Sequence, residues 1–152
     1  MGLKETLKAD LTTAMKARDE VASSTIRMIL TAITNEEVAG KEAKTLSDAE
    51  IITVLSREMK KRREAAEAFD AAGRADKAAS EKAEGEIISK YLPAQMSEDE
   101  IKKLIAETIT KVGASSPADM GKVMGAIKGE VAGKADGALV SSLVKAALAG
   151  GN

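Results

Sequence analysis

Five glycines recur at intervals of four residues near the C-terminal end of a chain that is otherwise rich in helix-forming residues. They are Gly121, Gly125, Gly129, Gly133 and Gly137. A glycine inside a helix costs roughly 1 kcal/mol relative to alanine, so this spacing requires a structural or functional reason. It predicts a small helical unit in which backbones approach closely, with turns toward the end of the series.

The composition favours helices over sheets. Of 152 residues, 44% are hydrophobic, yet Phe69 and Tyr91 are the whole aromatic set. Alanine, leucine, isoleucine and methionine must therefore fill the core, and this mixture suits closely packed helices better than strands. The sequence predicts an all-α protein.

Histidine and cysteine are both absent from the sequence. Zinc sites, disulfides and Ser-His-Asp or Cys-His triads are thereby excluded, and no nucleophile or phosphate-loop motif takes their place. We expect no catalytic, cofactor-binding or metal-binding residue. The chain opens without a signal-peptide pattern and has no uncharged apolar stretch of the ~20 residues that span a bilayer, so we expect a cytoplasmic protein without a membrane partner.

Apolar residues at helical spacing predict four helices before Pro93. Ser47 and Glu50 have the spacing of a capping box at the start of the third helix, and Gly73 is suited to end it in the left-handed conformation. The fourth helix runs from about residue 75 to 91. The expected inward-facing residues are Leu3, Leu7, Leu11 and Met15; Ile26, Ile29, Leu30 and Ile33; Ile51, Leu55, Met59 and Phe69; and Ile87 and Ile88.

Pro93 marks the best candidate boundary, which divides the chain into a helical part at 1–94 and a smaller helical domain at 95–152. Ser97 begins a fifth helix that Gly113 ends, and Ser116-Pro117 begins the helix that carries Gly121 and Gly125. We expect Gly129 and Gly133 to end that helix. Asp136 caps a last helix whose inner residues are Leu139, Val140, Leu143, Val144 and Leu148.

Four segments resemble the YqeY-like proteins: Arg27-Met28-Ile29-Leu30, Tyr91-Leu92-Pro93, Asp119-Met120-Gly121-Lys122-Val123-Met124-Gly125 and Gly133-Lys134-Ala135-Asp136-Gly137. From about Ser97 onward the chain is similar to the tail domain of GatB, the tRNA-handling subunit of the glutamine-dependent amidotransferases. In those enzymes the tail contacts the body of the tRNA, and the chemistry lies in other domains. The resemblance carries the family label of a carbon–nitrogen ligase with glutamine as amido-N donor.

Three functions follow. The favoured one is a tRNA-associated accessory protein of translation, in or near the amidotransferase pathway, without catalysis of its own. A second is a catalytic partner in amide transfer, and a third is a helical protein-interaction module without nucleic-acid binding. Charge does not favour RNA, because residues 97–152 contain seven lysines and seven acidic residues. The tRNA hypothesis therefore rests on the resemblance, and the oligomeric state stays open.

The candidate contacts to tRNA, or to a tRNA-handling enzyme, are the lysines beside the glycines: Lys122, Lys128 and Lys134. A second candidate set is the densest basic run, although the acids interleaved with it, Glu58 and Glu64, favour a salt-bridged helix face. The run consists of Arg57, Lys60, Lys61, Arg62 and Arg63. For Gly121 and Gly125 we favour close packing of two helices over an approach of RNA. Tyr91 is interpreted as a packing anchor at the boundary.

Overall fold

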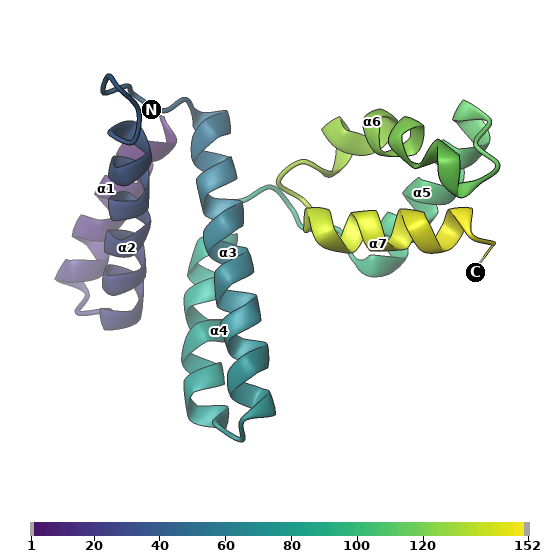
Figure 1. Ribbon diagram of the computed structural model, residues 1–152. Coiled ribbons are helices and arrows are strands. Elements are labelled where there is room, and N and C mark those ends of the chain that lie inside the picture. Colours follow the sequence, from purple (N-terminus) through teal and green to yellow (C-terminus); the bar gives the residue numbers. More distant parts are fainter. Residues whose placement is uncertain (1, 151–152) are drawn as a thin grey trace. The chain divides into compact units, whose positions relative to one another are not determined.

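The computed structural model describes residues 2–150, and within this range all the regular secondary structure is helical, which confirms the all-α prediction. Its helices are α1 (Leu3–Lys16), α2 (Glu20–Glu37), α3 (Asp48–Ala71), α4 (Ala75–Ser89), α5 (Glu98–Val112), the short 3-10 turn η1 (Pro117–Asp119), α6 (Met120–Val131) and α7 (Gly137–Leu148). The contacts divide the chain into two compact units, Met1–Leu92 and Pro93–Asn152 (Figure 1).

The first unit consists of two helical hairpins, α1–α2 and α3–α4, each with its helices side by side (Figure 1). Its core is aliphatic, as the composition requires. The side chains that are completely or almost completely buried are Leu7, Ile26, Ile29, Ile33, Ile51, Leu55 and Ile88.

Local sequence signals set the ends of these helices. Asp19 accepts a hydrogen bond from the Ala22 backbone N–H at 3.0 Å and begins α2. Ser47 and Glu50 form the predicted capping box at the start of α3. Gly73, with φ +73°, allows the chain to turn after α3, because a left-handed residue without a Cβ carries no steric penalty.

Two predicted core positions of the first unit differ in the structure. Met15 is 51% exposed, because Ala14 takes the buried position in the last turn of α1. Phe69 is half-buried, since α3 extends there beyond the aliphatic core, and its ring lies 5.6 Å from Lys77 Nζ.

The second unit packs α5, α6 and α7 around a separate core of Ile101, Ile105, Val123, Ile127, Val140 and Val144. Ser97 accepts a hydrogen bond from the Glu100 backbone N–H and begins α5, which Gly113 ends in the left-handed conformation. The predicted end of α6 at Gly129 is wrong, because the helix continues to Val131. Gly133, with φ +73°, makes the turn that follows.

The segment before α5 is tied to the turn after α6. The Met96 backbone N–H donates to the Lys134 carbonyl at 2.9 Å. The Gln95 side-chain amide donates to the Gly133 and Pro93 carbonyls, each at 2.8 Å. These hydrogen bonds fix the residues just after Pro93 to the turn that carries Lys134.

Candidate nucleic-acid interface

Helix α6 has one face in the core and one bare face in solvent. Val123, Ile127 and Val131 are buried. Gly121, Gly125 and Gly129 are exposed, and a Cβ added to any of them would meet no atom of residues 2–150 within 4 Å apart from the adjacent backbone of its own helix. The favoured prediction that Gly121 and Gly125 lie at a helix contact is therefore wrong. The apolar stripe of α6 makes the helix contacts, and the glycines point away from it.

Two of the predicted lysines, Lys122 and Lys128, lie beside the exposed glycines. We call this surface the glycine face of α6, and it consists of Gly121, Gly125, Gly129, Lys122 and Lys128. Both lysines are exposed. At roughly 100° of rotation per residue, Lys122 falls on one side of the glycine line and Lys128 on the other. The single acid of the helix, Glu130, falls well away from that line. The glycine face is therefore locally positive, although the unit as a whole is neutral.

Lys134, the third predicted lysine, lies in the turn between α6 and α7 and not on the glycine face. It is half-buried, and its backbone N–H donates to the Val131 carbonyl at 2.9 Å. The structure thus brings together Lys122 and Lys128 on one helix and leaves Lys134 beyond the end of that helix.

Asp119 holds the turn at the start of η1, just before α6, and its carboxylate moderates the positive charge of α6. Its carboxylate accepts hydrogen bonds from the Ser115 and Ser116 backbone N–H groups at 2.8 and 3.2 Å. These bonds, together with the charge of Lys122, hold the pKa of the Asp119 carboxyl below its usual value. The carboxylate is therefore charged at neutral pH and offsets part of the field of Lys122.

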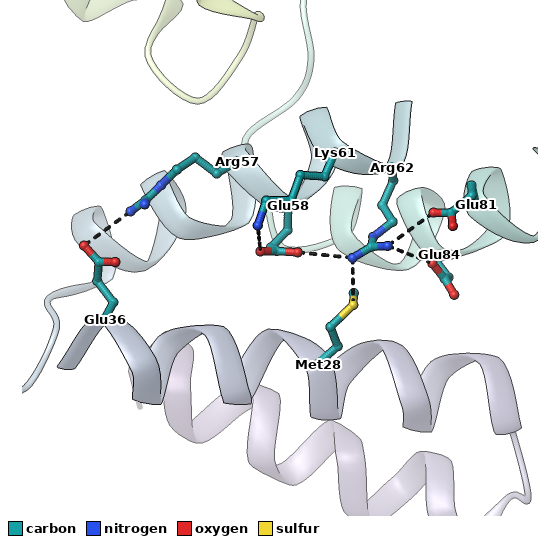
Figure 2. Close-up of polar contacts among 8 residues, drawn as sticks. All are labelled: Met28, Glu36, Arg57, Glu58, Lys61, Arg62, Glu81 and Glu84. Atoms are coloured by element: carbon teal, nitrogen blue, oxygen red, sulfur yellow. Dashed lines mark hydrogen bonds and ion pairs between the residues drawn. The ribbon is translucent and has the colours of Figure 1, made fainter. Parts of the chain in front are cut away.

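The alternative basic run on α3 is salt-bridged, as the interleaved acids predicted. Arg57 pairs with Glu36 at 3.5 Å, and Lys61 pairs with Glu58 at 3.1 Å (Figure 2). Lys60 pairs with Glu64 at 4.0 Å, and Arg63 is also engaged with a partner. Arg57, Lys60 and Lys61 are thus already paired with neighbouring carboxylates, so the run is a poorer surface for a polyanion than its composition implies.

In the sequence Arg62 belongs to that run and Glu58 is one of the acids interleaved with it, yet their side chains are only 19% and 9% exposed. The spacing of these two residues is a signal of burial. Positions 51, 55, 58 and 62 continue a single helical stripe that begins with the buried Ile51 and Leu55. Charged residues on an otherwise apolar stripe indicate a buried ion pair.

Tyr91 is anchored at the end of the first unit. Its hydroxyl donates to Asp10 Oδ2 at 2.6 Å, and its ring packs against the core of that unit. Burial and the neighbouring Asp10 carboxylate raise the pKa of Tyr91 above its usual range. The hydroxyl therefore stays protonated and fixes the chain just before Pro93, as expected for a packing anchor.

The described residues contain neither a metal-binding cluster nor a membrane-spanning helix. No cluster of three or more acidic residues within residues 2–150 is arranged to hold a metal ion. None of the helices in this range is both long and apolar enough to cross a bilayer.

Comparison with known proteins identifies the family. The model of the Yqey-like protein family matches residues 4–148. "Altered inheritance of mitochondria protein 41, mitochondrial" from Clavispora lusitaniae is 34% identical over 115 residues, which cover 74% of this chain and 66% of that protein. The protein of the same name from Saccharomyces cerevisiae strain S288c is 35% identical over 125 residues, covering 78% and 66%. The chain thus spans slightly less than two thirds of the length of these relatives.

The names of these relatives contradict the predicted cytoplasmic localisation, because each is called a mitochondrial protein. The prediction used the lack of cysteine, of a signal-peptide pattern and of a long apolar stretch. None of these features distinguishes the cytosol from the aqueous interior of another compartment.

Proposed function

The chain belongs to the Yqey-like protein family, and on that premise we propose that it is a non-catalytic, tRNA-associated protein that presents the glycine face of α6 to folded RNA. The observation that carries the proposal is the exposure of Gly121, Gly125 and Gly129, each with open space where a side chain would lie. Lys122 and Lys128 border that surface. The sequence resemblance of residues 97–152 to the GatB tail supports the same partner.

A bare helix backbone suits a ligand that is recognised by shape. Folded RNA offers a continuous sugar–phosphate surface, and proteins contact double-stranded RNA largely through phosphates and 2′-hydroxyls. Without side chains at the three glycine positions, such a surface can approach the helix closely. The flanking lysines then supply contacts to phosphates, and the few charges involved imply weak, salt-sensitive binding.

The relation to the amidotransferase is the finer part of the proposal and rests on the GatB resemblance alone. In that role the chain acts as an accessory to a tRNA-handling enzyme, and amide transfer stays with other proteins. The names of the relatives support a mitochondrial setting for this role.

The first test neutralises the candidate lysines. Changing Lys122, Lys128 and Lys134 together to Gln should weaken tRNA binding, measured by filter retention from low ionic strength upward. Each lost phosphate contact should reduce the log–log salt slope by about 0.7–0.9. The matched control changes three exposed lysines of α5, Lys102, Lys103 and Lys111, to Gln. This variant loses the same charge, and the salt slope of its tRNA binding should stay unchanged.

The second test fills the glycine face without removing charge. Gly125→Leu should weaken tRNA binding at least tenfold while the helix stays folded, because the new side chain separates the RNA from the backbone. Ala126→Leu, at an exposed neighbouring position of α6, is the matched control and should bind as the wild type does.

The outcomes distinguish the candidate functions. Wild-type protein that retains no tRNA even at low ionic strength would rule out the proposal and leave the protein-interaction module as the leading function. If tRNA binding survives both the lysine changes and Gly125→Leu, the contact with tRNA lies elsewhere than on α6. Ammonia release from glutamine by the purified protein would instead favour a catalytic role in amide transfer.

A further inference from the structure

The guanidinium of Arg62 lies where α2, α3 and α4 meet (Figure 2). Its Nη2 donates to Met28 Sδ on α2 at 2.8 Å and to Glu58 Oε2 on α3 at 3.3 Å. Its Nη1 donates to Glu81 Oε2 on α4 at 3.3 Å and lies 3.6 Å from Glu84 Oε2. We call Arg62 with Glu58, Glu81 and Glu84 the Arg62 cluster. It joins α4 to both of the other helices.

The cluster is largely shielded from water. The side chains of Arg62 and Glu81 are 19% exposed, that of Glu84 is 30% exposed, and that of Glu58 is 9% exposed. The Nε of Arg62 is buried and has no hydrogen-bond partner among the described residues. The guanidinium is thus held in place without satisfying all of its donors, and an additional or rearranged acceptor would be favourable.

Negative charge exceeds positive charge inside the cluster. Three carboxylates surround one guanidinium, and Lys61 adds a second cation through Glu58 at 3.1 Å. Helix α2 contributes the neutral Met28. Two further cations line the α3–α4 groove: Arg63, which has its own partner, and Lys82, which pairs with Asp70 at 3.0 Å. Two further acids, Glu67 on α3 and Glu86 on α4, line it as well.

Glu84 is the member least well compensated. Its distance to the Arg62 guanidinium, 3.6 Å, is the longest of the three carboxylates, and Glu81 lies about one helical turn away on the same helix. Burial, and then the like charge of Glu81, raise the pKa of the Glu84 carboxyl, while Arg62 opposes the rise. The charged form of Glu84 therefore costs stability in the folded protein.

We propose that the Arg62 cluster is a proton-dependent clamp on α4, which holds this helix more tightly against α2 and α3 when Glu84 is protonated. Protonation removes the repulsion between Glu84 and Glu81 and leaves Arg62 balanced by Glu58 and Glu81. Because Glu84 binds its proton more tightly in the folded than in the unfolded chain, its contribution to stability is fully present below the ordinary glutamate value of 4.5. That contribution is lost as the pH rises through the raised value.

The test compares Glu84→Gln with the wild type over a pH series, because glutamine mimics the protonated form at every pH. The Tm of full-length Glu84→Gln should exceed that of the wild type by about 2–4 °C at pH 7, and the difference should vanish near pH 4. Glu107→Gln, at an exposed position of α5 outside the α3–α4 groove, controls for the loss of one glutamate charge. The pH dependence of the Tm of Glu84→Gln is measured against that of this control.

A lower Tm for Glu84→Gln at pH 7, or an offset that is the same at every pH, would overturn the clamp. A second measurement does not depend on any variant. The side-chain carboxyl ¹³C resonance of Glu84 in the wild-type protein should titrate with a midpoint above 4.5. A midpoint at or below that value would equally overturn the proposal.

Discussion

Helices α3 and α6 show two different uses of charged residues. α3 contains the densest basic run of the chain, and its cations are held by nearby carboxylates, with Arg62 drawn into the interior. α6 contains only Lys122, Lys128 and Glu130 as charged residues, yet both lysines project into solvent beside a bare backbone. A high local count of basic residues therefore does not by itself identify a surface for a polyanion. The decisive factor is how close the compensating acids lie.

The largest contrast between the two helices should come from removing Arg62. Arg62→Ala leaves three largely buried carboxylates facing one another, so we expect a loss of about 3 kcal/mol in the free energy of unfolding. The measurement is urea denaturation at pH 7. Arg57→Ala, which breaks a half-exposed pair on the same helix, should cost less than about 0.5 kcal/mol, and Lys122→Ala on α6 should be similarly mild. A loss below 1 kcal/mol for Arg62→Ala would remove the distinction between buried and surface charges.

A side chain added to the glycine face should raise the free energy of unfolding, whereas the loss of Arg62 lowers it. Gly125→Leu should raise the free energy of unfolding by up to about 1 kcal/mol, because the leucine meets open space and favours the helix. Ala126→Leu should change it by only a few tenths. A destabilisation of 1–3 kcal/mol in the same urea assay would indicate overpacking and restore the helix-contact interpretation of the glycines.

The smallest expected effect concerns the start of α6 and depends on pH. The pKa of Asp119 is lowered in the folded protein, so its charge contributes stability above the ordinary value of 3.8, and this is lost as the pH falls through the folded value. Asp119→Asn should therefore lower the Tm at pH 7, with a difference that shrinks below pH 3.8. Glu84→Gln should show the opposite sign at pH 7. Tm differences of the same sign at pH 7 for Asp119→Asn and Glu84→Gln would contradict the environments assigned to these two carboxyl groups.

Sequence patterns were sufficient to predict the helices because most of their boundaries carry explicit signals. Ser47 and Ser97 cap α3 and α5 as expected, and Gly73 and Gly113 adopt left-handed conformations after them. Two positions are exceptions. Met15 is exposed because Ala14 takes the buried position in the last turn of α1, and α6 continues through Gly129 because Val131 still reaches the core.

The candidate site was only partly predictable. The candidate lysines were predicted because they lie next to glycines in the sequence. The sequence alone does not show whether those glycines face another helix or solvent. The direction in which the glycines face depends on which stripe of α6 packs against α5 and α7. The packing of Val123 and Ile127 in the core determines that stripe. The Arg62 cluster was missed because Glu81 and Glu84 come from another helix, and sequence spacing does not reveal such pairings.

The hydrogen bonds of Gln95 and Met96 to the turn after α6 have a practical consequence for dissecting the protein. A fragment that starts at Ser97, the N-cap of α5, would lack Gln95 and Met96, which donate hydrogen bonds to the Gly133 and Lys134 carbonyls. A fragment that starts at Pro93 would keep them. On the proposed function, the shorter piece would bind RNA differently because its lysine-bearing turn had been released. A comparison of isolated fragments would then misattribute that change to the missing N-terminal helices.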